Sequence, residues 1–521
     1  MSQPDTILIM DFGGQYTQLI ARRVRELAVY SEIVSYTAKI SDIRALKPKG
    51  IILSGGPKSV YDKESPSISE DFFTYCKDQA IPILGICYGL QLIGHVFGGK
   101  ITSYPKKEYG KTGINVLKQK GLLEGLGATE LVWMSHGDQV TKLPENFEAI
   151  ASSETCPIAA IQSKTDQIYA VQFHIEVNHT PKGMQILRNF VFSICKCAPN
   201  WKMAGFINET ISKIQDRVKN ERVIMAVSGG VDSTVAARLI EKAIGDRVSC
   251  IFVDNGLMRK NEVAEVKQNF EEILKLKHFF VVDASNLFLS RLKGITDPEE
   301  KRRIIANTFF EVFEAKAEEL KGRGGKIKFL GQGTIAPDRI ESGVTSGASA
   351  KIKSHHNVTL PEKLSLEVLE PLALLYKDEV RQVGKELGIP EDFIQRHPFP
   401  GPSLAIRIIG DVTEEKLKIV RESDAILIEE IRKAGIYNKV WQAFTSYLPI
   451  KSVGVMGDAR TYQNMVLIRM IESQDAMTAN FAKVDWDLLE RIASRIINEV
   501  PGVNRVVYDI SNKPPATVEL E

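Results

Sequence analysis

Short apolar runs that end in glycine or polar residues recur along this 521-residue chain, and amphipathic helical patterns separate them. Residues 6–10, 51–53, 81–86 and 170–173 are such runs in the first 197 residues. Buried strands separated by helices predict an α/β fold with a mostly parallel, doubly wound sheet. Since ligands of such folds collect beyond the carboxyl ends of the strands, the residues directly after these runs are the candidate functional residues.

A second α/β pattern begins near Trp201, with strands predicted at 222–227, 248–253 and 326–330. At residues 397–402 the run His-Pro-Phe-Pro-Gly-Pro excludes a helix, because each proline restricts itself and its predecessor. The remaining sequence mixes helices with β-branched strands and predicts a smaller α+β unit. At about 150 residues per domain, the length fits three domains. We expect them at residues 1–198, 199–396 and 397–521.

The charge balance excludes a general electrostatic attraction to polyanions. Sixty-seven basic and 65 acidic side chains leave a net charge of +2, so no footprint for nucleic acid or anionic membrane follows from it. No stretch approaches the ~18 consecutive apolar residues of a membrane helix, and the N-terminus lacks the features of a secretory signal. Six cysteines in so long a chain do not indicate a disulfide framework. These features predict a cytoplasmic protein.

The first candidate nucleophile is Cys87, which lies between a predicted buried strand and a helix in Gly-Ile-Cys-Tyr-Gly. Small flanking residues allow the strained strand-to-helix turn that presents a nucleophile above a sheet edge. The helix N-terminus that follows favours the thiolate. His174 and Glu176 occupy alternate positions of an extended segment and so share a face. His174 is therefore a candidate proton shuttle, and Glu176 a candidate partner that orients its ring.

A tetrahedral oxyanion also needs backbone donors, for which Gly56 of the Gly-Gly turn and the N–H of Tyr88 are candidates. The alternative is that Cys87 is a buried core cysteine and His174 a structural histidine. Taken singly, each residue favours that alternative. The combination of the turn at Cys87, the Gly-Gly turn and the His-x-Glu pair favours catalysis.

On these motifs, residues 1–197 resemble a class I glutamine amidotransferase domain. The resemblance implies that Cys87, His174 and Glu176 release ammonia from glutamine through a γ-glutamyl thioester. It assigns the glutamine-side segments to Gln91, Ser135, His136 and Asp138. That family usually has proline where this chain has Ile175, a substitution that could alter how stiffly His174 is held.

A second candidate site is the loop Ser228–Ser233, whose glycines and hydroxyls open a helix and could cradle phosphate. It lacks the Walker pattern and instead resembles the PP-loop of ATP pyrophosphatases. The resemblance implies that ATP is bound by Ser228, Gly229, Gly230, Val231, Asp232, Ser233 and Val253. Asp232 would also lie near a magnesium ion.

Lys377 belongs to a segment, 375–380, that resembles a second motif of the PP-loop family. As a point cation it would neutralise the charge that develops on phosphate. The alternative is an exposed lysine at the start of a helix, which the segment without the resemblance would favour.

The end of the chain, residues 513–519, resembles the C-terminal signature of the GMP synthetases. The resemblance implies that Lys513 and Glu519 bind the acceptor nucleotide and that this domain forms a homodimer. Arg302 would meet the acceptor phosphate in a bidentate contact, although a basic cluster on a helix surface remains an alternative. Residues 352–357 resemble a segment that closes over the site. Departures from the family include a shortened loop after Asn357 and Ser403 in place of glycine.

The order of the three units covers essentially the entire chain and implies a GMP synthetase. Such an enzyme hydrolyses glutamine, uses ATP and Mg²⁺ to adenylylate XMP, and aminates the product to GMP with release of AMP and pyrophosphate. The rival is an RNA-modifying enzyme, because PP-loops also activate tRNA bases. The neutral charge and the absence of an aromatic-basic motif argue against RNA. A third alternative, a glutamine or nucleotide sensor, does not explain an intact Cys-His-Glu set.

Overall fold

The computed structural model describes residues 4–62, 64–321, 327–341, 366–473 and 478–521. The segment 352–357 and the loop after Asn357 lie outside these residues. Two compact units divide the chain, one built mainly from residues up to Phe206 and the other mainly from those after it. Among the described residues, no helix combines the length and the apolar character needed to cross a membrane.

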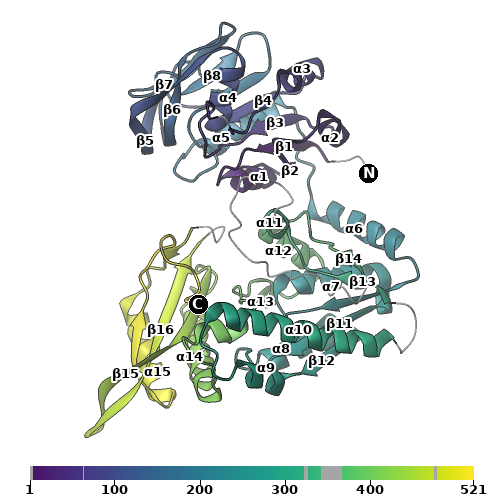
Figure 1. Cartoon of the computed structure of the whole chain (residues 1–521), viewed down its shortest axis with the longest axis vertical. Coiled ribbons are helices and arrows are strands. Elements are labelled where there is room, and N and C mark those ends of the chain that lie inside the picture. Colours follow the sequence, from purple (N-terminus) through teal and green to yellow (C-terminus); the bar gives the residue numbers. More distant parts are fainter. Residues whose placement is uncertain (1–3, 63, 322–326, 342–365, 474–477) are drawn as a thin grey trace. The chain divides into compact units, whose positions relative to one another are not determined.

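Unit 1 is built around a nine-stranded sheet in the order β2-β1-β3-β4-β9-β8-β7-β5-β6 (Figure 1). Its first five strands run parallel. They are β2 (Tyr30–Ser35), β1 (Thr6–Asp11), β3 (Gly50–Leu53), β4 (Ile83–Ile86) and β9 (Ile168–Val171). Every residue of β1, β3 and β4 is buried, as expected for parallel strands that helices cover on both faces. This half confirms the predicted doubly wound sheet, with strand ends shifted by one or two residues.

Helices follow the parallel strands of unit 1. They are α1 (Thr17–Glu26), α2 (Ile40–Leu46), α3 (Glu70–Asp78), α4 (Tyr88–Val96) and α5 (Gly183–Arg188). The apolar face of α1 places Ile20 and Val24 in the core at spacing i, i+4. α1 is therefore one of the amphipathic helices expected between the apolar runs.

The other half of the sheet is antiparallel and was not predicted. It consists of β8 (Ala160–Ser163), β7 (Phe147–Ser153), β5 (Lys100–Val116) and β6 (Thr129–Lys142). The core of β6 alternates between buried and partly exposed residues, the pattern of a strand with one solvated face. A search for continuous apolar runs overlooks such strands, because half of their residues are polar.

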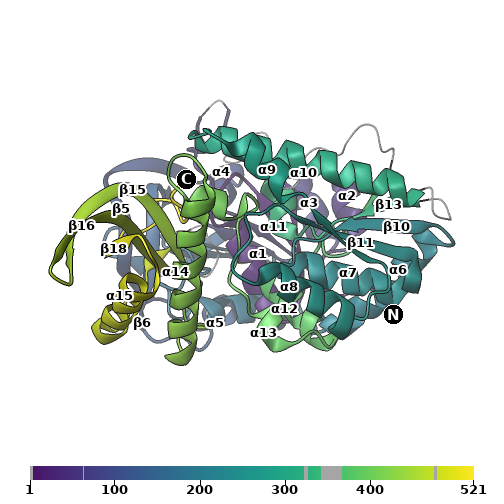
Figure 2. The ribbon, with the colours of Figure 1, turned by 90° about the horizontal axis from the view of Figure 1, so that it is seen from below.

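Unit 2 begins with a five-stranded parallel sheet in the order β12-β11-β10-β13-β14. The strands are β12 (Phe279–Asp283), β11 (Val248–Asp254), β10 (Arg222–Ala226), β13 (Ile327–Gly331) and β14 (Glu367–Leu369). Figure 2 shows α9 (Ser285–Leu292) and α10 (Pro298–Lys321) on one face, with α7 (Val231–Ile244), α8 (Glu262–Gln268) and α12 (Lys377–Glu386) on the other. The predicted second α/β domain is confirmed.

The last part of unit 2 is a small α+β element, as predicted. A long antiparallel hairpin of β15 (Gln442–Met456) and β16 (Ala459–Glu472) is joined by β17 (Asn480–Phe481) and β18 (Val503–Tyr508). Helices α14 (Glu414–Lys433) and α15 (Trp486–Glu499) cover it. Both helices begin at an N-cap side chain, Thr413 for α14 and Asp485 for α15, which accepts backbone N–H bonds of the first turn.

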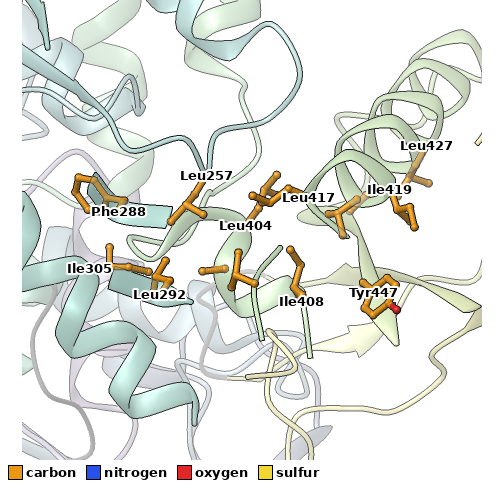
Figure 3. Close-up of a cluster of buried hydrophobic side chains, with 14 of the residues drawn as sticks. Leu257, Phe288, Leu292, Ile305, Leu404, Ile408, Leu417, Ile419, Leu427 and Tyr447 are labelled. Carbon is orange, nitrogen blue, oxygen red and sulfur yellow. The ribbon is translucent and has the colours of Figure 1, made fainter. Parts of the chain in front are cut away.

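One apolar cluster runs through both parts of unit 2 (Figure 3). It joins Leu257 and Phe288 of the parallel-sheet part to Leu404, Leu417 and Tyr447 of the C-terminal part. Leu404 lies in the turn that follows the proline-rich run and is fully buried. The domain boundary expected between residues 396 and 397 therefore remains a prediction, because the apolar cluster extends across it.

Candidate active sites

Cys87 lies at the junction of β4 and α4 in a strained conformation, with φ +54° and ψ −102°. The flanking glycines are required by close packing. A Cβ on Gly85 would lie 2.7 Å from the carbonyl oxygen of Gly89, and a Cβ on Gly89 would lie 2.5 Å from that of Leu53. Non-glycine residues with positive φ concentrate at functional sites, where the surrounding structure compensates the strain. The predicted nucleophile turn at Cys87 is therefore present.

His174 follows β9, and two hydrogen bonds of its backbone groups hold it in place. Its N–H donates to the carbonyl of Trp133 at 3.0 Å, and its carbonyl accepts a bond from the Thr180 hydroxyl at 2.6 Å. Neither hydrogen bond involves the next residue, Ile175. Ile175, in the position of the family's proline, is simply buried. These bonds, rather than a proline ring, fix the direction of the His174 side chain.

The imidazole of His174 pairs with Glu176. Nδ1 lies 2.6 Å from Oε1 of the carboxylate, and both side chains are buried. Burial lowers the pKa of His174, but the Glu176 carboxylate and the Cys87 thiol act in the opposite direction and hold it well above 6.5. An imidazole that keeps a proton at neutral pH stabilises a thiolate beside it. The geometry thus brings all three predicted residues into one electrostatic group.

The Gly-Gly turn predicted as an oxyanion site borders this group. A Cβ on Gly55 would lie 3.5 Å from Cε1 of His174 and 3.9 Å from Cβ of Cys87. Gly56 packs against the ring of Tyr88, since its Cβ would lie 3.1 Å from Cγ of that ring. The donor roles of the Gly56 and Tyr88 amides remain predictions.

The predicted glutamine-side residues lie beside the nucleophile. The carbonyl of Ser135 is 3.7 Å from the Cys87 sulfur, and the Gln91 amide donates to the carbonyl of Asp138 at 2.7 Å. His136 is buried, and burial lowers its pKa despite the opposing carboxylate of Glu108. The β5–β6 hairpin, which the sequence analysis missed, therefore carries this side of the site.

Gln172 is a residue that the sequence analysis missed. Its side chain is fully buried, and its Nε2 lies 3.7 Å from the Cys87 sulfur. Gln172 and His174 are alternate positions of one extended segment, the same spacing that links His174 to Glu176. That spacing was a signal for Gln172 that the sequence analysis did not use.

The PP-loop connects β10 to α7, and hydroxyls organise it. The Ser233 hydroxyl donates to the carbonyl of Gly230 at 3.1 Å and lies 3.3 Å from the backbone nitrogen of Ser228. Thr234 donates to the same Gly230 carbonyl at 2.8 Å. These two bonds turn the Gly230 carbonyl towards α7. An anion at the N-terminus of α7 would meet N–H groups and a favourable helix dipole.

Lys377 meets this loop although it lies 145 residues away along the chain. Its ammonium nitrogen is 2.5 Å from Oδ2 of Asp232. Lys377 is the first residue of α12, and Tyr376 and Glu379 form a capping box that fixes this end of the helix. The two PP-loop segments inferred from the sequence are therefore neighbours in space, which the alternative of a solvated surface lysine does not explain.

The second oxygen of Asp232, Oδ1, is buried and has no hydrogen-bond partner within the described part of the chain. A carboxylate oxygen of this kind beside a phosphate-binding loop suits Mg²⁺, which prefers oxygen ligands. The residues present therefore fit the predicted metal.

The predicted acceptor residues make contacts within unit 2. Arg302 donates to the Glu299 carboxylate at 2.8 Å and to the backbone oxygen of Glu521 at 2.6 Å. Glu519 accepts a bidentate pair from Arg407 at 3.1 and 3.0 Å. Lys513 pairs with Ala479 through backbone hydrogen bonds. The tail that carries Glu519 thus reaches the first turns of α10, where Arg302 lies.

Arg407 is a second residue that the sequence analysis missed. Its side chain is fully buried, it packs over the rings of Phe399 and Phe444, and its Nη1 has no partner in the described residues. A buried guanidinium needs a partner, and Glu519 supplies one. A single arginine in an apolar run carried no motif, so only the fold connects it to Glu519.

Ser403, the departure from the family's glycine, keeps a glycine-like backbone with φ +56°. Its hydroxyl accepts a bond from the side chain of Asn255 at 3.1 Å, directly after β11. Positive φ at a serine is unfavourable, and this buried bond offsets part of the cost. Serine at this position therefore adopts the backbone conformation that glycine would favour.

Three family models match the chain. The model for class-I glutamine amidotransferases matches residues 8–194, and the model for NAD synthase matches residues 203–296. The model for the GMP synthase C-terminal domain matches residues 429–520. The order of these matches is the order of the units inferred from the sequence.

Curated relatives match over nearly the full length. Proteins named "GMP synthase [glutamine-hydrolyzing]" from Brachyspira hyodysenteriae and Aquifex aeolicus are each 52% identical, with 99% of this chain and 99% of the relative covered. The protein of that name from Thermosipho melanesiensis is 53% identical, with 99% of this chain and all of the relative covered.

Proposed function

The chain belongs to the family of glutamine-hydrolysing GMP synthases, and from this membership we propose how its residues divide the reaction. The reaction hydrolyses glutamine to ammonia, adenylylates XMP with ATP, and aminates the adenylylated acceptor to GMP with release of AMP and pyrophosphate. We assign the glutaminase to residues 1–198, ATP activation to 199–396 and the acceptor and dimer contacts to 397–521.

The glutaminase reaction starts with attack of the Cys87 thiolate on the carboxamide carbon of glutamine. The amides of Gly56 and Tyr88 donate to the resulting oxyanion. His174 gives its proton to the departing nitrogen, and Glu176 keeps the imidazole oriented. A water molecule, deprotonated by His174, then hydrolyses the γ-glutamyl thioester to glutamate. Gln91, Ser135 and Asp138 bind the substrate glutamine, whereas both ring nitrogens of His136 are engaged by Asp138 and Glu108.

In the synthetase reaction, the C2 carbonyl oxygen of XMP attacks the α-phosphorus of ATP and pyrophosphate leaves. The loop Ser228–Ser233 and Val253 hold the nucleotide. Lys377 neutralises the charge that develops on the leaving pyrophosphate. Mg²⁺ would supply further charge neutralisation there, and Asp232 would hold it. Ammonia then displaces AMP to give GMP.

Arg302, Lys513 and Glu519 bind the acceptor nucleotide in this scheme. Arg302 suits the phosphate, because a guanidinium can donate two parallel bonds to it. Arg407 holds Glu519 by the bidentate pair described above and so acts as a positioning residue.

The Lys377–Asp232 pair is the observation that carries the proposal. A Cys-His-Glu group alone would suit any glutamine amidotransferase. The pair joins two segments of a nucleotide-activating motif at the phosphate-binding loop of the same chain. It therefore supports ATP cleavage as the chemistry of the second unit.

The substrate assignment is tested by the release of AMP and pyrophosphate from ATP, with Mg²⁺ and glutamine, across candidate acceptors. We expect release with XMP, accompanied by GMP in equal amount, and no release with IMP or with unmodified tRNA. Release with tRNA but not with XMP would contradict the assignment and favour the RNA-modifying alternative.

A homodimer is proposed from exposed apolar side chains on the β15–β16 hairpin. Val453 and Val455 point to the same side of β15, and Tyr462 lies opposite Val453 in register. Their exposed fractions are 58%, 73% and 65%. An exposed group of apolar side chains on a regular sheet face is typical of a protein interface.

Replacing this apolar surface should dissociate the dimer. We expect the Val455→Asp/Tyr462→Asp double variant to elute as a monomer at micromolar concentration, because two charges would be buried unpaired in the interface. Trp486→Gln is the matched control, since Trp486 is 80% exposed at the start of α15 and outside this surface. Light scattering after size-exclusion chromatography distinguishes the forms. A wild-type monomer, or a double variant that remains dimeric, would contradict the proposal.

A cytoplasmic location is part of the proposal. The six cysteines are all free and buried, which suits a reducing compartment.

A further inference from the structure

A second group of metal-ligating side chains lies in unit 1, apart from the Cys87–His174–Glu176 group. Glu108 comes from β5, His136 from β6 and Cys156 from the loop after β7. One potential ligand atom from each residue lies within 4.8 Å of the other two. The side chains of His136 and Glu108 are 5% and 9% exposed, and Cys156 is fully buried.

The two ring nitrogens of His136 both face hydrogen-bond acceptors. Nδ1 of His136 faces the carbonyl of Asp138 at 3.1 Å, and Nε2 faces the Glu108 carboxylate at 2.9 Å. Both partners are acceptors, whereas a neutral imidazole has only one N–H. Whichever nitrogen carries it, the other opposes an acceptor unless a further proton or a metal ion lies there.

The surroundings favour a metal ion at Nε2. Metal-bound histidines usually donate their other ring N–H to a carbonyl or carboxylate, the role that Asp138 would fill. The Ser153 hydroxyl donates to the second oxygen of Glu108 at 3.3 Å and accepts the backbone N–H of Cys156 at 2.8 Å. The Ser153 hydroxyl thus orients two of the three candidate ligands, Glu108 and Cys156.

We propose that Glu108, His136 and Cys156 bind a divalent ion of the zinc class. Imidazole, thiolate and carboxylate together are typical zinc ligands, and a thiolate disfavours Mg²⁺ and Ca²⁺. Zinc bonds of about 2.0–2.3 Å place tetrahedral ligand atoms roughly 3.3–3.8 Å apart, so closure needs movements of about 1 Å. Water would complete the tetrahedron.

Charge balance supports this ion. Zinc bound to one carboxylate, one thiolate and a neutral imidazole is neutral overall, which suits a buried site.

The test uses Co²⁺ and Zn²⁺ with the full-length protein. We expect one tightly held equivalent of Zn²⁺ after dialysis, and a near-ultraviolet thiolate-to-metal charge-transfer band when Co²⁺ replaces it. Cys156→Ala should lose the band and weaken metal binding at least tenfold, while glutamine-dependent GMP synthesis stays near wild type in metal-free buffer. Cys156→Ser serves as a second variant if the alanine variant is unstable.

Two controls separate this site from other thiols. Cys87→Ala removes the thiol of the other Cys-His-Glu group, and Cys76→Ala removes a buried thiol elsewhere in unit 1. Both variants should keep the charge-transfer band. The proposal is overturned if wild-type protein shows no band, if the band survives Cys156→Ala, or if it disappears in Cys87→Ala. None of these outcomes depends on the assigned GMP synthase activity.

Discussion

Replacing Cys87 by alanine should reduce glutamine-dependent GMP formation by about four orders of magnitude or more, because it removes the thiol assigned to the γ-glutamyl thioester. Synthesis from ammonium salts should stay within about twofold of wild type, since unit 2 performs that chemistry without the thiol. The measurement is GMP formation from XMP and ATP with each nitrogen donor in turn. The ratio of the two rates reports the glutaminase alone and cancels losses due to protein stability.

Cys76→Ala is the matched control for this experiment. Cys76 is buried in α3, and burial raises the pKa of its thiol to about 12, so it cannot supply a thiolate at neutral pH. We expect this variant to keep both activities, with only the modest loss of stability that a core truncation brings. Persistent glutamine-dependent synthesis in Cys87→Ala would show that the nucleophile has been wrongly assigned.

Lys377→Met should lower synthesis from glutamine and from ammonium salts alike, by about 10²–10³-fold. Removing one preorganised charge that acts on the transition state commonly has an effect of this size, on the order of 3–4 kcal/mol. The loss should fall on kcat for pyrophosphate release rather than on the KM for XMP, because Lys377 meets the PP-loop at Asp232 and not the acceptor residues. Glutamine hydrolysis in unit 1 supplies the ammonia but cannot compensate.

Lys385→Met is the control on the same helix. Lys385 lies in the last turn of α12, where it pairs with the exposed Glu391 at 2.7 Å. Exposed pairs contribute little to stability, so this variant should behave as wild type. Lys377→Arg separates charge from shape, and we expect partial activity because the guanidinium keeps the charge but changes its position. Equal rates for Lys377→Met and Lys385→Met would contradict the catalytic role.

The Cys87→Ala and Lys377→Met variants distinguish the two half-reactions. Cys87→Ala affects one nitrogen donor, whereas Lys377→Met affects both. This contrast follows from the separate positions of the two groups, one at the end of β4 in unit 1 and the other at the loop after β10 in unit 2. A glutamine or nucleotide sensor would show neither pattern.

Local sequence was sufficient for the sites whose geometry depends on neighbours along the chain. Cys87 and the PP-loop each follow a buried strand directly, and the strand, the turn and the helix are all encoded within about fifteen residues. His174 and Glu176 share a face because extended residues alternate. The predicted parallel strands were confirmed for the same reason: continuous apolar runs between helices have few other ways to be buried.

The sequence analysis failed where half of a strand is polar. The β5–β6 hairpin has only one short apolar run, at residues 131–134, yet it carries Glu108, Ser135, His136 and Asp138 to the side of Cys87. In a strand of alternating polar and apolar residues, which face is buried is decided only when a neighbouring element covers it. The antiparallel half of unit 1 was overlooked on these grounds.

Long-range contacts decided the rest. The sequence by itself determined the order of the units and predicted the nucleophile, its base and the phosphate loop, because each motif depends on residues close together in the chain. Only the tertiary structure brought Lys377 to Asp232, Glu519 to Arg407 and Cys156 to His136. Those contacts join segments whose separation carries no periodic or spacing signal, and the buried charges among them are stable only where the fold provides a partner.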